Sequence, residues 1–516
     1  MKMRELTFDC TGIDIAFAHV TDFKRRPIAD SRVVRDGNSL VVKLSGDIPM
    51  SLQIAVNVGG FGRVACTADQ RGNGYVEPGE FLLLRELALS HQCRAERTAS
   101  TWQVNEPIEL VQSREKSAKS AWQDTTSNLM ASLASALIAG EEIARASAER
   151  ILDQRIQKGS EGPLVSATLF GERLEQWSIG VGPDWEPTQA APDFARPLDH
   201  QKYVAALCNA TTLPNFWRWI EPQRGKPRWE VLDTLVEFCE QNDLRMKSFA
   251  LYWGGIGGCP MWLRGLPYRQ QLRAIEAWVT QIVGRYKGQI LAWETVNEMH
   301  NWTFADPFRW SHAQFLEVTR LVNDLVGALD PGTPRVINNC LIWGDYAQNQ
   351  PGMWTPLSYL DEVIQAGIPF EGIGLQYYNP GRDLLECLLQ MDAFAAFGKS
   401  LWITEMGTPS DSRPLQRKET MEIPPSAVDP MLGWRGPYTP EGQADWIELW
   451  YTLASSRPAL KAINWWDFTD SQAFVAHAGL LNMDGTPKLS YSRLQAWCKK
   501  YGFGKQSRVS AESQQG

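Results

Sequence analysis

The sequence has little that would mark a metalloprotein or a disulfide-stabilised protein. The chain of 516 residues has nine cysteines that form no CxxC pair, and their odd number leaves at least one thiol free. Neither a zinc site nor a disulfide framework is indicated by this pattern. The six histidines are dispersed along the chain rather than clustered. We therefore expect no metal ion and no cofactor.

Long apolar runs and an excess of basic residues are also lacking. No stretch is apolar enough to cross a bilayer, and residues 1–9 lack the apolar region of a signal peptide. The chain as given is thus expected to be cytoplasmic, or secreted if a signal has been removed. The formal net charge of −8 gives no reason to expect nucleic acid or a membrane as a partner. A neutral or weakly charged ligand is more natural, and the oligomeric state is left open.

Tryptophan, by contrast, is abundant. The chain has 22 tryptophans, and all but Trp102 and Trp122 lie beyond residue 170. Aromatic rings stack on the apolar faces of sugars, although they also fill ordinary cores. The enrichment favours a polysaccharide or oligosaccharide as the ligand of the larger, C-terminal part of the chain.

The chain is too long for one ordinary domain, and its pattern changes along its length. Residues 1–115 show short alternating runs, such as 39–44, separated by turn residues, which predicts a β-sandwich-like module. Residues 116–164 are rich in helix formers and predict a helical connector. We expect the module to pack on the rest of the chain, because Trp102 alone offers little stacking surface to a polysaccharide. The polar tail, 504–516, is expected to be disordered.

Residues 165–503 alternate short apolar runs with amphipathic helical stretches, which indicates parallel strands joined by crossover helices. A (β/α)8 barrel explains the number and spacing of these elements better than an open sheet does. The clearest helices are expected over 231–240 and 269–286. Strands are expected over 246–253, 290–296, 335–339, 372–377, 400–404 and 462–466.

Two glutamates, Glu298 and Glu405, end apolar, β-favouring runs about a hundred residues apart. Cleavage of a glycosidic bond with retention needs two carboxyl groups roughly 5 Å apart, one as acid and one as nucleophile. Residues at the C-terminal ends of barrel strands supply such groups. Either glutamate alone could cap a helix or form a surface ion pair. The two together favour a retaining glycosidase.

The segments around these glutamates resemble the xylanases of glycoside hydrolase family 10. The segment 293–298, Trp-Glu-Thr-Val-Asn-Glu, is similar to the family's W-D-V-V-N-E, and 403–405, Ile-Thr-Glu, is similar to its I-T-E. The resemblance covers about residues 160–500. It implies a barrel with Glu298 as general acid/base and Glu405 as nucleophile.

Further segments resemble the family in the same order along the chain. The likeness covers residues 209–222, 251–253, 372–376, 466–470 and 480–488. It implies that substrate is bound by Asn215, Arg218, Trp253, Asn297, Gln376 and Trp466. Trp302, Trp434 and Trp465 are weaker candidates. The proline-rich segment 407–442 follows the nucleophile and is expected to be a loop that forms a wall of the cleft.

The departures from the family gather around the sugar on the non-reducing side of the scissile bond. Two family histidines are replaced by Phe249 and Gly254, a third by Tyr378, a lysine by Arg218 and a tryptophan by Phe474. Tyr378 could still donate a hydrogen bond to the nucleophile, but Phe249 cannot replace the hydrogen bonds of a histidine. The sugar at the −1 position is therefore expected to differ in its hydroxyl pattern.

The sequence thus predicts a retaining hydrolase of β-1,4-linked xylan or xylo-oligosaccharides that works by double displacement. For this chemistry the pKa of Glu298 must be raised relative to that of Glu405. One alternative is a related β-glycosidase acting on another β-glycan, such as β-glucan or short oligosaccharides. The other is a carbohydrate-binding protein without turnover, although neither carboxylate is missing.

Overall fold

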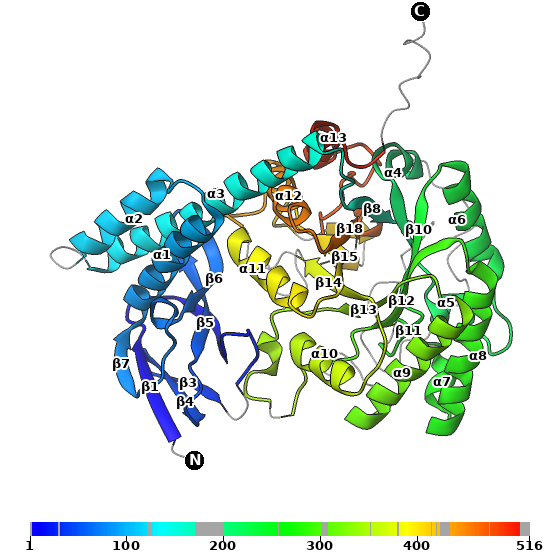
Figure 1. Cartoon of the computed structure of the whole chain (residues 1–516), viewed down its shortest axis with the longest axis horizontal. Helices are drawn as coiled ribbons and strands as arrows, with labels where there is room; N and C mark the ends of the chain where they lie inside the picture. Colours follow the sequence, from blue (N-terminus) through cyan, green and yellow to red (C-terminus); the bar gives the residue numbers. More distant parts are fainter. Residues whose placement is uncertain are drawn as a thin grey trace, which may run out of the picture.

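The computed structural model describes residues 3–28, 31–120, 125–170, 200–255, 257–300, 308–350, 352–378, 381–413, 415–418, 421–423, 434–473 and 475–505. An N-terminal module and a larger barrel lie side by side, and the long helix α3 (Thr125–Gln157) runs along both (Figure 1). Each of the nine cysteines carries a free thiol. Among the helices in these ranges, none is long and apolar enough to cross a membrane.

The N-terminal module contains two β-sheets that share one core. One sheet has the order β3-β4-β1-β7 and the other β2-β5-β6. In β4 (Ser39–Ser45), Leu40, Val42 and Leu44 are buried and alternate with more exposed neighbours, as in a sheet with one face on a core. The other strands are β1 (Met3–Asp9), β2 (Ile15–Thr21), β3 (Arg32–Asp36), β5 (Ser51–Val58), β6 (Gly62–Ala68) and β7 (Gly79–Leu82).

Helices begin earlier in the chain than the sequence pattern predicts. The expectation of strands as far as residue 115 is wrong, because α1 (Leu83–Trp102) follows β7 directly. Its buried residues Leu84, Leu87 and His91 recur at spacings of three and four, so the period is that of a helix packed on a core. The helix α2 (Ile108–Lys119) comes next, before α3.

The C-terminal part is a closed barrel of parallel strands (Figure 1). The strands are β8 (Leu164–Thr168), β9 (Ala210–Leu213), β10 (Arg245–Ser248), β11 (Tyr252–Trp253), β12 (Ile290–Asn297), β13 (Arg335–Asn339), β14 (Gly372–Tyr378), β15 (Ser400–Gly407) and β18 (Leu460–Trp465). Both β10 and β11 pair with β12, so together they occupy one strand position of the ring. The ring is closed because β18 pairs with β8. The ring thus has eight places, as in a (β/α)8 barrel.

The barrel strands expected from the sequence are present, although the run over 246–253 is divided between β10 and β11. Helices cover the outside of the ring: α4 (Gln201–Leu207), α5 (Trp217–Ile220), α6 (Trp229–Gln241), α7 (Met261–Arg264), α8 (Tyr268–Tyr286), α9 (His312–Leu329), α10 (Pro356–Gln365), α11 (Leu384–Ala395), α12 (Pro440–Ser455) and α13 (Leu489–Tyr501). A small hairpin, β16 (Leu415–Lys418) and β17 (Met421–Ile423), follows β15. Short 3-10 turns span Gln70–Gly72, Asp345–Ala347 and Asp470–Gln472.

The module and the barrel are joined by buried polar contacts. Glu386 of α11 accepts hydrogen bonds from Arg25 and from Arg94 of α1, the latter at 2.7 Å, and its side chain is only 1% exposed. The backbone N–H of Ala65 donates to the carbonyl of Gly381 at 2.9 Å. Along α3, the N-terminal half packs in the core of the module and the C-terminal half in that of the barrel. These contacts agree with the expected packing role of the module.

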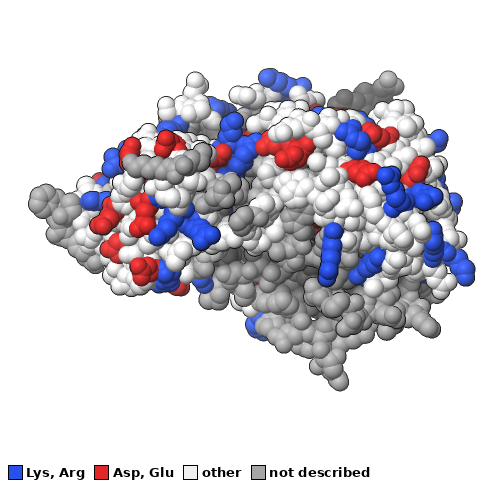
Figure 2. Space-filling model, turned by 90° about the horizontal axis from the view of Figure 1, so that it is seen from below, with Lys and Arg blue, Asp and Glu red and all other residues white. Residues whose placement is uncertain are grey.

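Two further observations concern the surface and the tail. Acidic and basic side chains are interspersed over the face seen in Figure 2, on the module and on the barrel. Lys505 lies against the barrel, where its N–H donates to the carbonyl of Leu207 at 2.9 Å and its ammonium donates to the carbonyl of Asn242 at 2.7 Å. The disorder expected for the tail therefore does not extend to Lys505, and residues 506–516 lie outside the described ranges.

Candidate active site

Glu298 and Glu405 lie at the C-terminal ends of two barrel strands. Glu405 is in β15, and Glu298 directly follows β12. Glu298 has a left-handed backbone, with φ 58°, which is uncommon for any residue except glycine. Its N–H donates to the carbonyl of Asn338 at 3.0 Å, so the neighbouring strand β13 holds this conformation in place. Backbone strain of this kind is found most often at functional sites.

The carboxylate of Glu298 is held by two neutral donors. The indole Nε1 of Trp253 donates to its Oε2 at 3.0 Å, and Nε2 of Gln376 donates to its Oε1 at 2.9 Å. The same amide of Gln376 lies 3.3 Å from Oδ1 of Asn297. Three of the residues that sequence resemblance placed at the substrate therefore lie beside this carboxylate.

Glu405 accepts hydrogen bonds from two other strands. The hydroxyl of Tyr378 in β14 donates to its Oε2 at 2.7 Å, which is the hydrogen bond expected from the sequence. Nδ2 of Asn338 in β13 donates to its Oε1 at 3.2 Å. Glu405 as a residue is 6% exposed and so is largely removed from solvent. Its orientation is therefore fixed by Tyr378 and Asn338.

The surroundings of the two carboxylates raise the pKa of each. Burial raises the pKa of Glu298. Burial, followed by the negative charge of Glu298, raises the pKa of Glu405 well above its usual range. Because like charges close together disfavour double ionisation, the two carboxyl groups favour sharing one proton. This agrees with the expected raised pKa of Glu298 but not with a lower pKa for Glu405 in the absence of substrate.

A further group of charged residues beneath the pair was not anticipated from the sequence. Lys247 of β10 forms an ion pair with Glu294 of β12, and their side chains are 5% and 0% exposed. Nδ2 of Asn338 donates to Oε1 of Glu294 at 3.0 Å as well as to Glu405. A buried lysine inside a barrel strand cannot be told from an exposed one by sequence period alone, because the interior of a small barrel is lined from every strand.

The other predicted ligands are placed differently. Nδ2 of Asn215 donates to the carbonyl of Phe249 at 3.1 Å. Arg218 lies in α5 and is 2% exposed; burial and the charge of Arg264 lower its pKa to about 10. Trp465 is buried and donates to backbone carbonyls, Trp434 packs between the two cores, and Trp302 lies outside the described residues.

Comparison with known proteins matches this chain to one family. The family model "Glycosyl hydrolase family 10" matches residues 187–496, which is more than half of the chain. The chain belongs to glycosyl hydrolase family 10. Among curated relatives, endo-1,4-beta-xylanase B of Thermotoga neapolitana is 24% identical over 294 residues, covering 54% of this chain and 75% of the relative. Endo-1,4-beta-xylanase 3 of Hypocrea jecorina is 30% identical over 171 residues, 32% of this chain and 47% of the relative.

Among solved structures, native xylanase 10B from Thermotoga maritima aligns with a TM-score of 0.48 and 21% identity, covering 69% of this chain and 98% of that one. The family membership makes this protein a glycoside hydrolase.

In this family 10 hydrolase, a row of aromatic rings crosses four neighbouring strand ends. Phe170 follows β8, Phe216 follows β9, Phe249 follows β10 and Trp466 follows β18. Ring centroids are 5.4 Å apart for Phe170 and Trp466, 5.4 Å for Trp466 and Phe249, and 4.2 Å for Phe249 and Phe216. All four are buried. Phe170 and Phe216 were not among the sequence candidates, since a lone phenylalanine at a strand end is indistinguishable from core.

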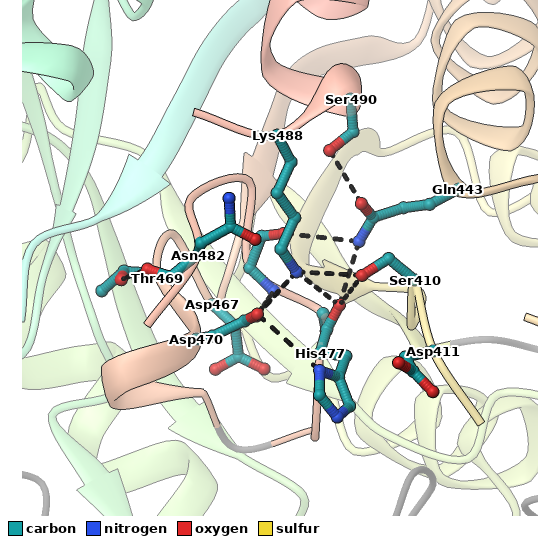
Figure 3. Close-up of polar contacts among 12 residues, drawn as sticks. Ser410, Asp411, Gln443, Asp467, Thr469, Asp470, His477, Asn482, Lys488 and Ser490 are labelled. Atoms are coloured by element: carbon teal, nitrogen blue, oxygen red, sulfur yellow. Dashed lines mark hydrogen bonds and ion pairs between the residues drawn. The ribbon is translucent and has the colours of Figure 1, made fainter. Parts of the chain in front are cut away.

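A polar cluster holds the segments that follow β15 and β18 (Figure 3). The ammonium group of Lys488 donates to Asp470 at 2.9 Å, to the hydroxyl of Ser410 at 3.0 Å and to the carbonyl of His477 at 3.0 Å. Nε2 of Gln443 in α12 donates to the same carbonyl at 3.2 Å. The cluster ties the segment that follows β15 to the segment that follows β18.

Proposed function

We propose that this family 10 hydrolase cleaves β-1,4-linked xylan or xylo-oligosaccharides with retention, by double displacement. The observation that carries the proposal is a pair of glutamates at two barrel strand ends, the half-buried Glu298 and the buried Glu405, each with a carboxylate held by two side-chain donors. Each is oriented by fixed hydrogen-bond donors, and preorganised groups of this kind are what stabilise charge in a transition state. The names of the two curated relatives described above, both endo-1,4-beta-xylanases, support xylan as the substrate.

The mechanism assigns each carboxyl group one role per step. Glu298 gives its proton to the glycosidic oxygen while Glu405 attacks the anomeric carbon, so that the leaving sugar departs with that proton and a glycosyl ester forms on Glu405. Glu298, now ionised, takes a proton from water, and the resulting hydroxide equivalent breaks the ester and frees Glu405. The proton shared by the pair therefore belongs on Glu298 once substrate is bound.

The neighbours of the pair fit these roles. Asn297 and Gln376 lie beside Glu298 and are placed to contact the 2-hydroxyl of the attacked sugar, where a hydrogen bond gains strength at the transition state. Tyr378 donates to Glu405 and holds the attacking oxygen in place. Trp253 restrains Glu298 and presents its remaining surface to the substrate.

A second candidate is a β-glycosidase of the same kind acting on another β-glycan or on short oligosaccharides. The aromatic row favours it, because Phe249 and Phe216 offer no hydrogen bond to a sugar on the non-reducing side. Asn215 directs its amide to a backbone carbonyl instead. Sites that recognise a hydroxyl by hydrogen bonding reject analogues that lack it, and an apolar wall loses that discrimination.

One experiment separates these candidates from a non-catalytic binding protein. Product release is followed from xylan, mixed-linkage β-glucan, carboxymethylcellulose and the matching aryl β-glycosides. The unaltered protein is compared with Glu405→Ala, Glu298→Ala and the control Glu276→Ala, which changes an exposed glutamate on α8. We expect cleavage of xylan by the unaltered and control proteins and loss of at least about 10³-fold in Glu405→Ala.

The stereochemistry of the first product tests the mechanism. Proton NMR should show the β-anomer forming before mutarotation, and azide should restore activity to Glu298→Ala on an activated aryl glycoside by replacing the base-assisted water. An initial α-anomer would rule out retention. If no substrate is cleaved and all four proteins bind polysaccharide equally, the catalytic proposal fails.

A further inference from the structure

Three strands bring a buried network under the reactive pair. Glu294 of β12 is 0% exposed, and Lys247 of β10 is its ion-pair partner. The ammonium of Lys247 also donates to the carbonyl of Ser248 at 2.8 Å, and the hydroxyl of Ser248 accepts from the N–H of Glu294 at 3.1 Å. Both charged groups therefore have fixed partners, as buried charges require.

Asn338 connects this ion pair to Glu405. Its Nδ2 lies 3.0 Å from Oε1 of Glu294 and 3.2 Å from Oε1 of Glu405, so one amide serves both carboxylates. Its Oδ1 accepts from the hydroxyl of Thr404 at 2.5 Å. Gly374 on the next strand leaves the space for this amide, because a Cβ there would lie 2.7 Å from Oδ1 of Asn338. The hydrogen bonds to both ends of the Asn338 amide, together with the close approach of Gly374, fix its orientation.

We propose that Lys247, Glu294 and Asn338 are positioning residues, in which the Asn338 amide orients Glu405 and the buried Lys247–Glu294 ion pair sets the charge state of the reactive carboxylates. This inference rests on the proposed function, since it assigns Glu298 and Glu405 as the reactive groups. None of the three residues has to touch the sugar.

The orientation of the ion pair decides its effect. Glu294, the negative end, is joined to Glu405 through a single amide, while Lys247 lies on the far side of Glu294. The charge of Glu294 contributes to the raised pKa of both Glu298 and Glu405, and Lys247 partly offsets it at Glu405. The pair thus favours retention of the proton that the mechanism requires.

The groups that face Glu405 come from every element packed around it. These are Glu294 on β12, Glu298 directly after β12, Lys247 on β10, Asn338 on β13, Tyr378 on β14 and Asp467 after β18, whose charge acts on Tyr378. Lys247 is the one cation among them in the described residues. Removing the Glu294 charge therefore leaves an excess of positive charge relative to the unaltered site, and ionisation of both reactive carboxyl groups becomes easier.

The test separates the effect of the Glu294 charge from the effect of the shape of its side chain. Glu294→Gln keeps the shape and removes the charge, whereas Glu294→Asp keeps the charge and shortens the side chain. The double variant Lys247→Met/Glu294→Gln removes the ion pair as a whole and serves if an unpaired Lys247 prevents folding. For each, kcat/KM is measured against pH with an activated aryl glycoside.

We expect both limbs of the profile to move to lower pH in Glu294→Gln, and in the same direction but less far in the double variant. The ratio of kcat/KM on the alkaline side to that on the acid side should fall at least about threefold. Glu294→Asp should lower kcat while the limbs stay in place. Limbs that stay in place in both charge-removing variants would overturn the proposal and leave the pair a purely structural one.

A direct titration separates failure of this inference from failure of the proposed function. Carbon NMR of glutamate labelled at the side-chain carboxyl measures ionisation without any turnover. In the unaltered protein, Glu294 should stay ionised over the range in which Glu298 and Glu405 share a proton. If Glu294 instead takes up that proton, the inference fails even in an active enzyme. If the titration agrees but no substrate is cleaved, the proposed function fails and the electrostatic arrangement stands.

Discussion

The junction between module and barrel should depend strongly on one buried carboxylate, Glu386. Its Oε2 accepts from Arg94 at 2.7 Å and from a second nitrogen of Arg25 at 3.1 Å, and its side chain is 1% exposed. Burial alone would raise its pKa, but the charges of Arg25 and Arg94 outweigh burial and lower it from 4.5 to about 2. The ionised form of Glu386 is therefore far more stable in the folded protein than in the unfolded chain.

That shift gives the magnitude. A depression from 4.5 to about 2 corresponds to ~3 kcal/mol of folding free energy at neutral pH. Breaking a buried ion pair by removing one partner costs a similar amount, about 3–5 kcal/mol. Because the pKa is lowered on folding, this contribution is complete above pH 4.5 and disappears as the pH falls toward about 2. We expect Glu386→Gln to lose ~3 kcal/mol of stability at neutral pH and progressively less in acid.

Equilibrium urea unfolding over a range of pH measures this loss. The matched control is Glu5→Gln, because Glu5 and Lys43 form an exposed pair, 57% and 48% exposed, at 3.0 Å. An exposed pair of this kind contributes about 0–1 kcal/mol, so the control should be close to the unaltered protein. A loss below about 1 kcal/mol in Glu386→Gln, or a loss that does not change between neutral and acid pH, would refute the reasoning.

Three further outcomes are expected. Tyr378→Phe removes the donor to Glu405, so kcat should fall about 10–100-fold and the acid limb of the pH–rate profile should move up, because that hydrogen bond lowers the pKa of Glu405; an unmoved limb would show that the hydroxyl is not coupled to the nucleophile. Trp253→Phe removes the donor to Glu298 and should instead move the alkaline limb up, measured with the same aryl glycoside. Deletion of residues 1–115 should abolish solubility, since the module packs on the barrel. In the full chain, Trp102→Ala should leave binding to insoluble polysaccharide unchanged. A soluble deletion product with weakened polysaccharide binding would contradict this packing role.

The features of this protein that the sequence could predict are those that depend on residues close together in the chain. Glu298 and Glu405 each end an apolar run, and a strand ending at the mouth of a barrel presents its last side chains there. The helices over 231–240 and 269–286 follow from apolar residues at spacings of three and four. The hydrogen bond from Tyr378 to Glu405 was also predictable, because the two strand ends are neighbours in the family's fold.

The local sequence pattern gave a wrong prediction where the apolar residues fit the period of a strand and that of a helix equally well. In α1 the sequence contains neighbouring leucines that fit a strand as well as a helix over a short window. Only packing against α3 and the two sheets of the module decides that the helical face is buried. For Arg218, the motif position predicts a sugar ligand, and only the fold shows that its side chain is buried and that the charge of Arg264 acts on it.

The sequence by itself determined the period of each element and the chemistry available at the strand ends. Only closure of the barrel decided which of these groups meet. Lys247, Glu294 and Asn338 come from three strands and share no sequence motif, yet Lys247 and Asn338 both donate to Glu294, and Asn338 also donates to Glu405. The aromatic row from Phe170 to Phe216 likewise exists only because β18 pairs with β8. Burial and the mutual approach of charges are properties of the folded ring, and they set the ionisation on which the chemistry depends.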